Sequence, residues 1–190
     1  MKVSQIIEMV DKFLNLQLPR VLFEPNGEEV LLQQEAKTDK VQSLVDCCNV
    51  VCDEMAHNYA PLYRKKVVNA SDGIVPFEEL DDLIEVFSLK DSDGFLATFI
   101  YGEEGLSTKN DGQYTVVYSV KPPKADFFGD IVAGLPAIDE RIFAYGVCAE
   151  YCLRMGMYDD MAIWDSRFKS ALAIATRKKT PLNLKQRSWC

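Results

Sequence analysis

The hydrophobic pattern of this chain changes its period twice. Residues 3–15 and 36–59 repeat apolar side chains at three- and four-residue steps, the spacing of one face of a helix. From about residue 69 short apolar and β-branched runs alternate with turn residues, and helical spacing returns after residue 135. This order predicts an α+β fold, mainly a helical bundle built from the N- and C-terminal helices with a β-rich insert in the middle.

Two helices are expected in the C-terminal third. The first follows Leu135-Pro136, with Asp139 at its expected N-terminus, and runs to about Met155. The second runs from Asp159 to Lys179, with acids first and bases last, an order that complements the helix dipole. Thr180-Pro181 is expected to end it, because proline lacks the amide proton and clashes with the preceding turn.

Three strands are expected in the insert, each bounded by residues that favour turns. The strands span 83–89, 95–101 and 114–120, and the turns span 69–73, 91–94 and 110–112. Lys121-Pro122-Pro123 ends the last strand, since proline cannot donate to a sheet ladder. The predicted organisation is a helical bundle from 1–68 and 136–178, a β-rich insert at 69–135 and an extended C-terminal tail at 179–190.

Composition narrows the class of function. Apolar residues make up 48% of the chain, enough for a sizeable core, and the net charge of −8 argues against a general binder of phosphate backbones. The sequence has no glycine-rich phosphate loop, no signal-peptide pattern and no apolar run long enough for a membrane span. We expect a soluble, intracellular protein with no cofactor.

The cysteines allow two interpretations. Cys48 and Cys52 are four residues apart, as are Cys148 and Cys152, so each pair shares a helix face. Four thiols on two packed helices can converge on zinc, but the same spacing arises where cysteine fills small apolar positions. We favour reduced core thiols and expect no metal.

The remaining candidates for catalysis are sparse. His57 is the only histidine, and no catalytic signature surrounds any cysteine. Paired acids are adjacent in sequence, so they do not face each other on a helix or strand, as a glycosidase or two-metal site requires. These pairs are Glu28-Glu29, Glu78-Glu79, Asp81-Asp82, Glu103-Glu104 and Asp159-Asp160. The sequence therefore predicts a protein that is not an enzyme.

Basic residues gather at Arg64-Lys65-Lys66 and again from Arg177 to Arg187. One interpretation is charge at helix ends and a solvated tail. The other is a docking segment for an acidic partner, with Lys185, Arg187 and Trp189 as its binding residues, because Trp and Arg are favoured at binding hot spots.

The segment from Gly73 to Ala175 resembles the head–tail connector, or neck adaptor, proteins of tailed bacteriophages, in the style of tail tubular protein A of short-tailed phages. Gly73-Ile74-Val75-Pro76 precedes a strand, and a hairpin-rich region ends in the run from Tyr114 to Pro123. Asp130 and Leu135-Pro136 follow, and then come two helices, the second rich in alanine and aromatics. The tail with Lys185, Arg187 and Trp189 is also similar to tails in that group.

The resemblance implies a structural virion protein. Such subunits form a homo-oligomeric ring under the portal protein, join the capsid to the tail tube or nozzle protein, and line the passage through which DNA moves without specific binding. The protein would then be assembled in the host cytoplasm and lie in the virion neck, with the tail bound to the portal and no membrane contact. A non-viral intracellular adaptor or regulatory interaction module is the alternative, and an enzyme is a third possibility.

Overall fold

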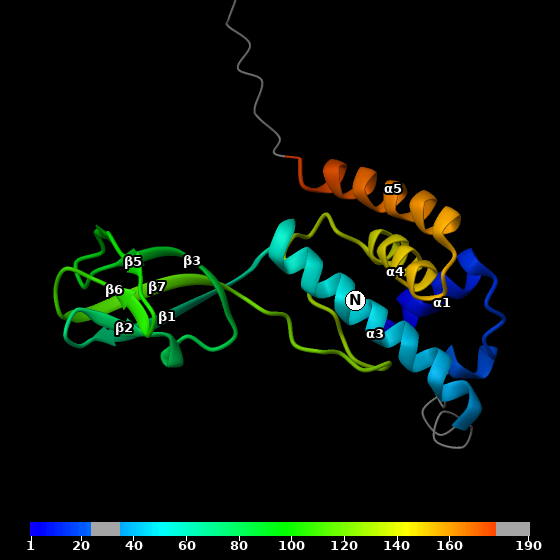
Figure 1. Cartoon of the computed structure of the whole chain (residues 1–190), viewed down its shortest axis with the longest axis horizontal. Coiled ribbons are helices and arrows are strands. Elements are labelled where there is room, and N and C mark those ends of the chain that lie inside the picture. Colours follow the sequence, from blue (N-terminus) through cyan, green and yellow to red (C-terminus); the bar gives the residue numbers. More distant parts are fainter. Residues whose placement is uncertain (24–34, 178–190) are drawn as a thin grey trace, which may run out of the picture.

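The computed structural model describes residues 1–23 and 35–177, with side chains from residue 39 in the second range, and divides them into two lobes (Figure 1). One lobe, here called the helical body, contains α1 (Val3–Leu14), α3 (Glu35–Asn58), α4 (Glu140–Arg154) and α5 (Tyr158–Ala175), with a 3₁₀ turn η1 (Arg20–Phe23). The other, the β lobe, contains all the strands of the described residues. The expected α+β class is confirmed.

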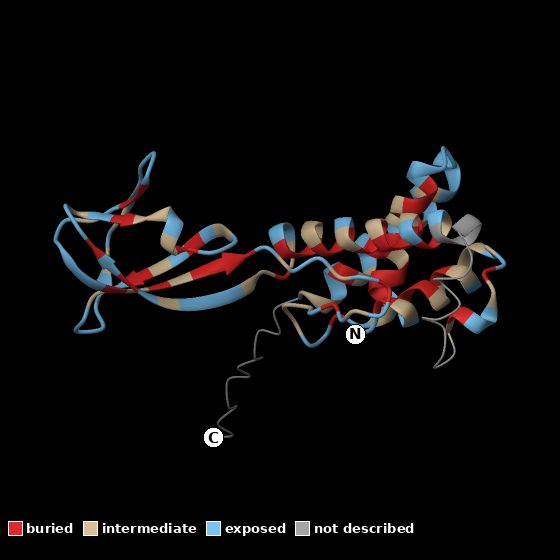
Figure 2. Ribbon diagram, turned by 90° about the horizontal axis from the view of Figure 1, so that it is seen from below, coloured by how far each residue is buried: buried red, intermediate tan, exposed pale blue. Residues whose placement is uncertain are grey.

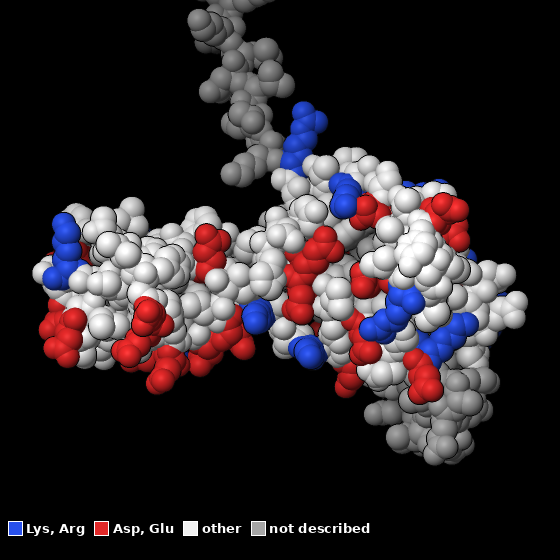
Figure 3. All heavy atoms as spheres, in the orientation of Figure 1, with Lys and Arg blue, Asp and Glu red and all other residues white. Residues whose placement is uncertain are grey.

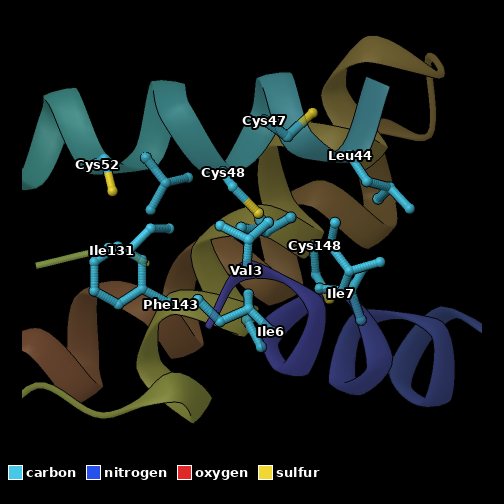
Figure 4. Packing of buried hydrophobic residues seen from close by; sticks show 14 of the residues in the cluster. Val3, Ile6, Ile7, Leu44, Cys47, Cys48, Cys52, Ile131, Phe143 and Cys148 are labelled. Atoms are coloured by element: carbon cyan, nitrogen blue, oxygen red, sulfur yellow. The ribbon is translucent and has the colours of Figure 1, made fainter. Parts of the chain in front are cut away.

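The helical body is held by residues from distant parts of the sequence (Figure 4). Its buried side chains include Val3, Ile6, Ile7, Leu44, Cys48, Phe143 and Cys148. Gly146 marks the closest approach of α4 to its neighbours, because a Cβ there would lie 2.9 Å from Val51 Cγ1 and 3.0 Å from the Phe168 ring. Only glycine at this position lets α4 pack so closely against α3 and α5.

The ends of α4 follow from local chemistry. Asp139 is the N-cap of α4, and its Oδ1 accepts a hydrogen bond from the Ile142 amide at 3.0 Å. Gly156 follows this helix with a φ of +74°, a conformation that glycine adopts without strain.

The prediction for α5 was wrong at its C-terminus. The helix ends at Ala175 instead of Lys179, while Thr180-Pro181 lies outside the described residues.

The β lobe consists of two small antiparallel sheets. The larger has the order β1-β7-β3-β4, and the smaller has the order β2-β6-β5. The strands are β1 (Leu62–Ala70), β2 (Ile74–Pro76), β3 (Leu83–Lys90), β4 (Leu96–Ala97), β5 (Ile100–Tyr101), β6 (Gly105–Ser107) and β7 (Gly112–Val120), with a 3₁₀ turn η2 at Phe77–Glu79.

A second core lies between the two sheets, and Figure 2 colours the buried residues of the strands red. It contains Val68, Ala70, Val75, Leu80, Val86, Leu89, Leu106, Tyr114, Val116, Tyr118 and Val120. Because alternate residues of a strand point to opposite faces, each sheet turns one face to this core and the other to solvent.

The strand predictions had mixed outcomes. The expected strands at 83–89 and 114–120 correspond to β3 and β7. The run 95–101 is not one strand: it divides into β4 and β5, which belong to different sheets. Sequence analysis assigned no strand to β1, which begins at Leu62, inside the range given to the helical bundle. Three consecutive basic residues, Arg64, Lys65 and Lys66, interrupt the alternation of apolar and polar side chains that would indicate a strand.

The chain passes between the lobes at residues 60–62 and again at 120–125. The return segment is tied to α3 by Asn49, whose side-chain amide donates to Ala125 O at 3.0 Å and whose carbonyl oxygen accepts from Ala125 N at 2.9 Å. Gly134 packs against the first crossing, because a Cβ added to Gly134 would lie 2.2 Å from Ala60 O. Within the described ranges, no helix combines the length and apolarity needed to cross a membrane.

Candidate functional site

The predicted cysteine pairs lie inside the helical body. Cys48 and Cys52 of α3 and Cys148 and Cys152 of α4 are buried and free, and Cys47 is buried beside them. Among the residues that the structure describes, no three His, Cys, Asp or Glu side chains gather in a way that could hold a metal ion. The burial expected of these cysteines is confirmed, and the zinc interpretation finds no site in the described ranges.

Burial also sets the reactivity of these thiols. It raises the pKa of Cys47 to about 11 and that of Cys52 to about 12, and it raises the pKa of Cys48, Cys148 and Cys152 as well. The thiolate is the nucleophilic form of cysteine, so these side chains are unreactive near neutral pH. They act as small apolar core residues.

His57 stands apart from the thiols. It is exposed near the end of α3, and its Nδ1 lies 2.7 Å from the Asp53 carbonyl oxygen, one turn earlier in the same helix. A nucleophile and its base must lie within hydrogen-bonding distance. The five described cysteines are buried while His57 faces solvent, so no cysteine–histidine pair forms among them.

The paired acids occupy separate surface positions. Glu78-Glu79 form part of η2, Glu103-Glu104 lie in the turn between β5 and β6, and Asp159-Asp160 lie in the first turn of α5. Asp81 contacts Lys66 at 3.1 Å, and this contact lowers the pKa of the Asp81 carboxyl group. Glu28-Glu29 lie outside the described residues. The described pairs are therefore dispersed rather than assembled into one site.

The hollows on the described surface are open to solvent. One lies between β4 and the turn before β7, and a second, near α1, is lined by Glu8, Asp11, Lys12, Arg20 and Phe23. In the second hollow Lys12 is already paired with Glu8, at 2.6 Å. The second hollow is lined by no Ser, Thr or Cys side chain.

The first basic cluster lies on β1. The Lys66 ammonium group donates to the Glu79 carbonyl oxygen and contacts Asp81, and Arg64 Nη1 lies 3.5 Å from the Asp81 carbonyl oxygen. Lys65 points to the opposite face of the strand and is exposed. The second cluster contains the predicted partner-binding residues Lys185, Arg187 and Trp189, all of which lie outside the described residues.

The sequence did not predict the exposed apolar side chains of the β lobe. The largest are Phe87, Phe95, Leu96 and Ile100, which expose 68–73% of their surface, and Tyr63 and Val67, which expose 54%. Tyr63 and Phe87 stack edge to face with ring centroids 5.2 Å apart. Tyr63, Val67, Phe87 and Leu96 lie on strands of the larger sheet, and a group of exposed apolar side chains marks an interaction site. The residue types are visible in the sequence, but their exposure depends on the arrangement of the sheets.

Comparison with protein-family models and with curated protein sequences found no match for this chain.

Proposed function

We propose that this protein is a structural subunit of the neck of a tailed bacteriophage. In this proposal its copies form a ring beneath the portal protein, join the capsid to the tail tube or nozzle, and surround the passage used by DNA. The supporting observation is the exposed apolar surface of the β lobe, held away from the helical body (Figures 1 and 2). A projecting lobe with such a surface suits contact with other subunits.

The helical body serves as the rigid part of the proposed subunit, a bundle formed from both ends of the chain that carries the β lobe as an insert. Its core joins α1, α3 and α4, and α5 packs on α4 through buried Phe168 and Leu172. Asn49 fixes the strand-to-helix return segment to α3, which limits the motion of the lobe relative to the body.

The charge of the chain is compatible with a channel for DNA. In Figure 3 acidic side chains gather along the lower edge of the β lobe, and basic side chains form no extended stripe on the face that is shown. The net charge of −8 supplies no general attraction for phosphates, so DNA can move past the subunits without being held. The proposed location is accordingly the virion neck.

The experiment combines location with portal binding. Mass spectrometry of purified virions and antibody labelling in electron micrographs should find the protein at the neck, and the purified chain should bind the portal protein encoded in the same genome. Deletion of residues 181–190 should leave the unfolding transition unchanged and weaken portal attachment at least about tenfold, since Trp189, Lys185 and Arg187 are the proposed anchors.

A triple substitution, Lys185→Ala with Arg187→Ala and Trp189→Ala, provides the matched control at full length. It should reproduce the effect of the deletion. Normal attachment after both changes would show that the tail has no role in binding. Absence of the protein from virions, together with no binding to portal, would refute the neck assignment and favour the intracellular adaptor.

A further inference from the structure

The larger sheet of the β lobe has a solvent face that its strand register defines. Partners across the sheet form two rows: Val67, Thr115, Lys90 and Leu96 in one, and Lys65, Val117 and Ser88 in the next. Tyr63 and Phe87 lie beside these rows in edge-to-face contact. The solvent face of an antiparallel sheet is normally polar. Here it combines large apolar side chains with two lysines, and we call it the lysine face.

The smaller sheet has its own solvent face on the opposite side of the lobe, since the core lies between the sheets. Register places Ile74, Ser107 and Ile100 in one row across β2, β6 and β5. Ile74 and Ser107 border a hollow together with Glu103 and Glu104. We call this surface the glutamate face.

The two faces carry complementary charges. The lysine face has Lys65 and Lys90, with Glu85 in the row of Tyr63, whereas the glutamate face has Glu103 and Glu104 with Lys109 near Ile100. Within the described residues, Lys65, Lys90, Glu103 and Glu104 make no salt bridge. Each face therefore offers an apolar row and an excess of unpaired charge that is positive on the lysine face and negative on the glutamate face.

From these observations we propose that the lysine face of one copy packs against the glutamate face of the next copy. The hollow beside Ile74 accepts a lysine side chain, because the aliphatic stem packs on isoleucine while the ammonium group meets Glu103 or Glu104. Two lysine faces packed together would place like charges in contact. The partner is thus a second copy of this chain, joined head to tail.

Head-to-tail contacts between different surfaces generate rings when the rotation closes and filaments when it does not. The inference rests on the proposed neck function and makes it more specific: the β lobes form one contact between adjacent subunits of the ring. It leaves the tail free to bind the portal.

The test uses two variants of the full-length chain, each with one damaged face. Lys65→Glu with Lys90→Glu damages the lysine face, and Ile100→Asp damages the glutamate face. All three side chains are exposed, so the folded state should persist, and circular dichroism checks this. Sedimentation velocity across a concentration series then measures self-association.

We expect concentration-dependent association of the unmodified chain and a dissociation constant at least about tenfold weaker for each variant alone. An equimolar mixture of the two variants should form a dimer and nothing larger, because each variant keeps one intact face. A chain carrying both lysine reversals together with Glu103→Lys and Glu104→Lys should regain association, since its charges are exchanged rather than removed.

The proposal is overturned if the unmodified chain remains monomeric throughout the series, if either variant alone associates normally, or if the mixture forms no dimer. Portal binding of the same preparations separates this result from the proposed function. If the variants associate as strongly as the unmodified chain and still bind the portal, only the lobe contact is rejected. If the variants show the expected association pattern but the protein neither binds the portal nor occurs in virions, the neck assignment is rejected and the contact between β lobes stands.

Discussion

The helical body and the β lobe differ in how their large apolar side chains are arranged. In the body, Phe143, Ile6 and Leu44 expose at most 1% of their surface, and the aromatic side chains of Phe13, Tyr145 and Trp164 stack on one another. In the lobe, Phe87 and Leu96 are mostly exposed although they lie within strands, Phe87 at an irregularity in the pairing of β3 with β7. The body also exposes Tyr158, Ile163 and Ile174 of α5, by 54–78% of their surface. What distinguishes the lobe is that Tyr63, Phe87 and Leu96 all lie on one sheet.

The two regions also have separate cores. No residue of the larger core belongs to the smaller one, and the lobe joins the body through two chain crossings. We therefore expect damage to one core to act mainly on its own region.

Removal of the Phe143 ring should have the largest effect. Phe143→Ala should lower the free energy of unfolding of the body by about 3–5 kcal/mol, because a large buried side chain leaves a cavity. Urea titration followed by Trp164 fluorescence measures this, in a Trp189→Phe background so that one tryptophan reports. Leu89→Ala, fully buried in the lobe, is the control and should leave the Trp164 transition in place. Equal shifts for both variants would show that the chain unfolds as one unit.

Alkaline pH should destabilise the body before the lobe, since the five described cysteines all lie in the body and residues 62–120 contain none. Folding raises the pKa of Cys47 to about 11 and of Cys52 to about 12. The unfolded chain therefore binds fewer protons above pH 9, and the free energy of unfolding falls as pH rises. Each thiol contributes a loss of about 1.4 kcal/mol per pH unit until its folded pKa is reached.

The measurement for this pH dependence is a series of urea titrations from pH 8 to pH 10.5. The variant with Cys47→Ala and Cys52→Ala is the control and should show a shallower decline, since it lacks two of the responsible thiols. A slope that is the same in both proteins would exclude these thiols as its source. Hydrogen exchange of the lobe strands over the same pH range should be corrected for the intrinsic exchange rate and compared with α3.

Loss of one buried thiol should cost less. Cys148→Ala should lower the free energy of unfolding by about 1 kcal/mol, because a fully buried small side chain is truncated without the loss of a structural metal. Metal analysis of the purified protein should find no stoichiometric zinc, and a chelator should leave the transition unchanged. Stoichiometric zinc would overturn the assignment of these cysteines as core thiols.

The smallest effect is expected in the lobe, from two tyrosines of β7. The Tyr114 hydroxyl donates to the Asn110 carbonyl oxygen at 2.9 Å, whereas the buried Tyr118 hydroxyl has no hydrogen-bond partner among the described residues. Tyr118→Phe should therefore be neutral or stabilise the lobe by up to about 1 kcal/mol, while Tyr114→Phe should destabilise it by about 1 kcal/mol. Hydrogen exchange of β7 amides gives both values. A destabilising Tyr118→Phe would show that its hydroxyl is bonded in solution.

The sequence predicted the long helices best. The apolar stripe of α3 and the Asp139 cap of α4 act over neighbouring residues, so their effects are readable without the tertiary structure. It failed for β2 and β6, three-residue strands that are too short for a periodic signal. The single apolar run at 95–101 contains both β4 and β5, because the chain crosses from one sheet to the other between residues 97 and 100.

The candidate site was less predictable. The cysteine spacing indicated a shared helix face and left zinc and core thiols both open, and the structure adds that the five described thiols are buried. No sequence pattern indicated the lysine and glutamate faces. Phe87 is exposed and Phe143 is buried, yet both are phenylalanine, and only their surroundings in the fold distinguish them.

By itself the sequence determined the α+β class, the positions of the four described α-helices and strands β3 and β7, and the absence of the common phosphate-loop motifs. These depend on local periodicity, caps and turn residues, which act within a few positions. The tertiary structure alone decided the pairing of β1 with β7, the division of residues 95–101 between two sheets, and which apolar side chains remain exposed. Those features depend on contacts between residues far apart in the chain, which local pattern does not encode.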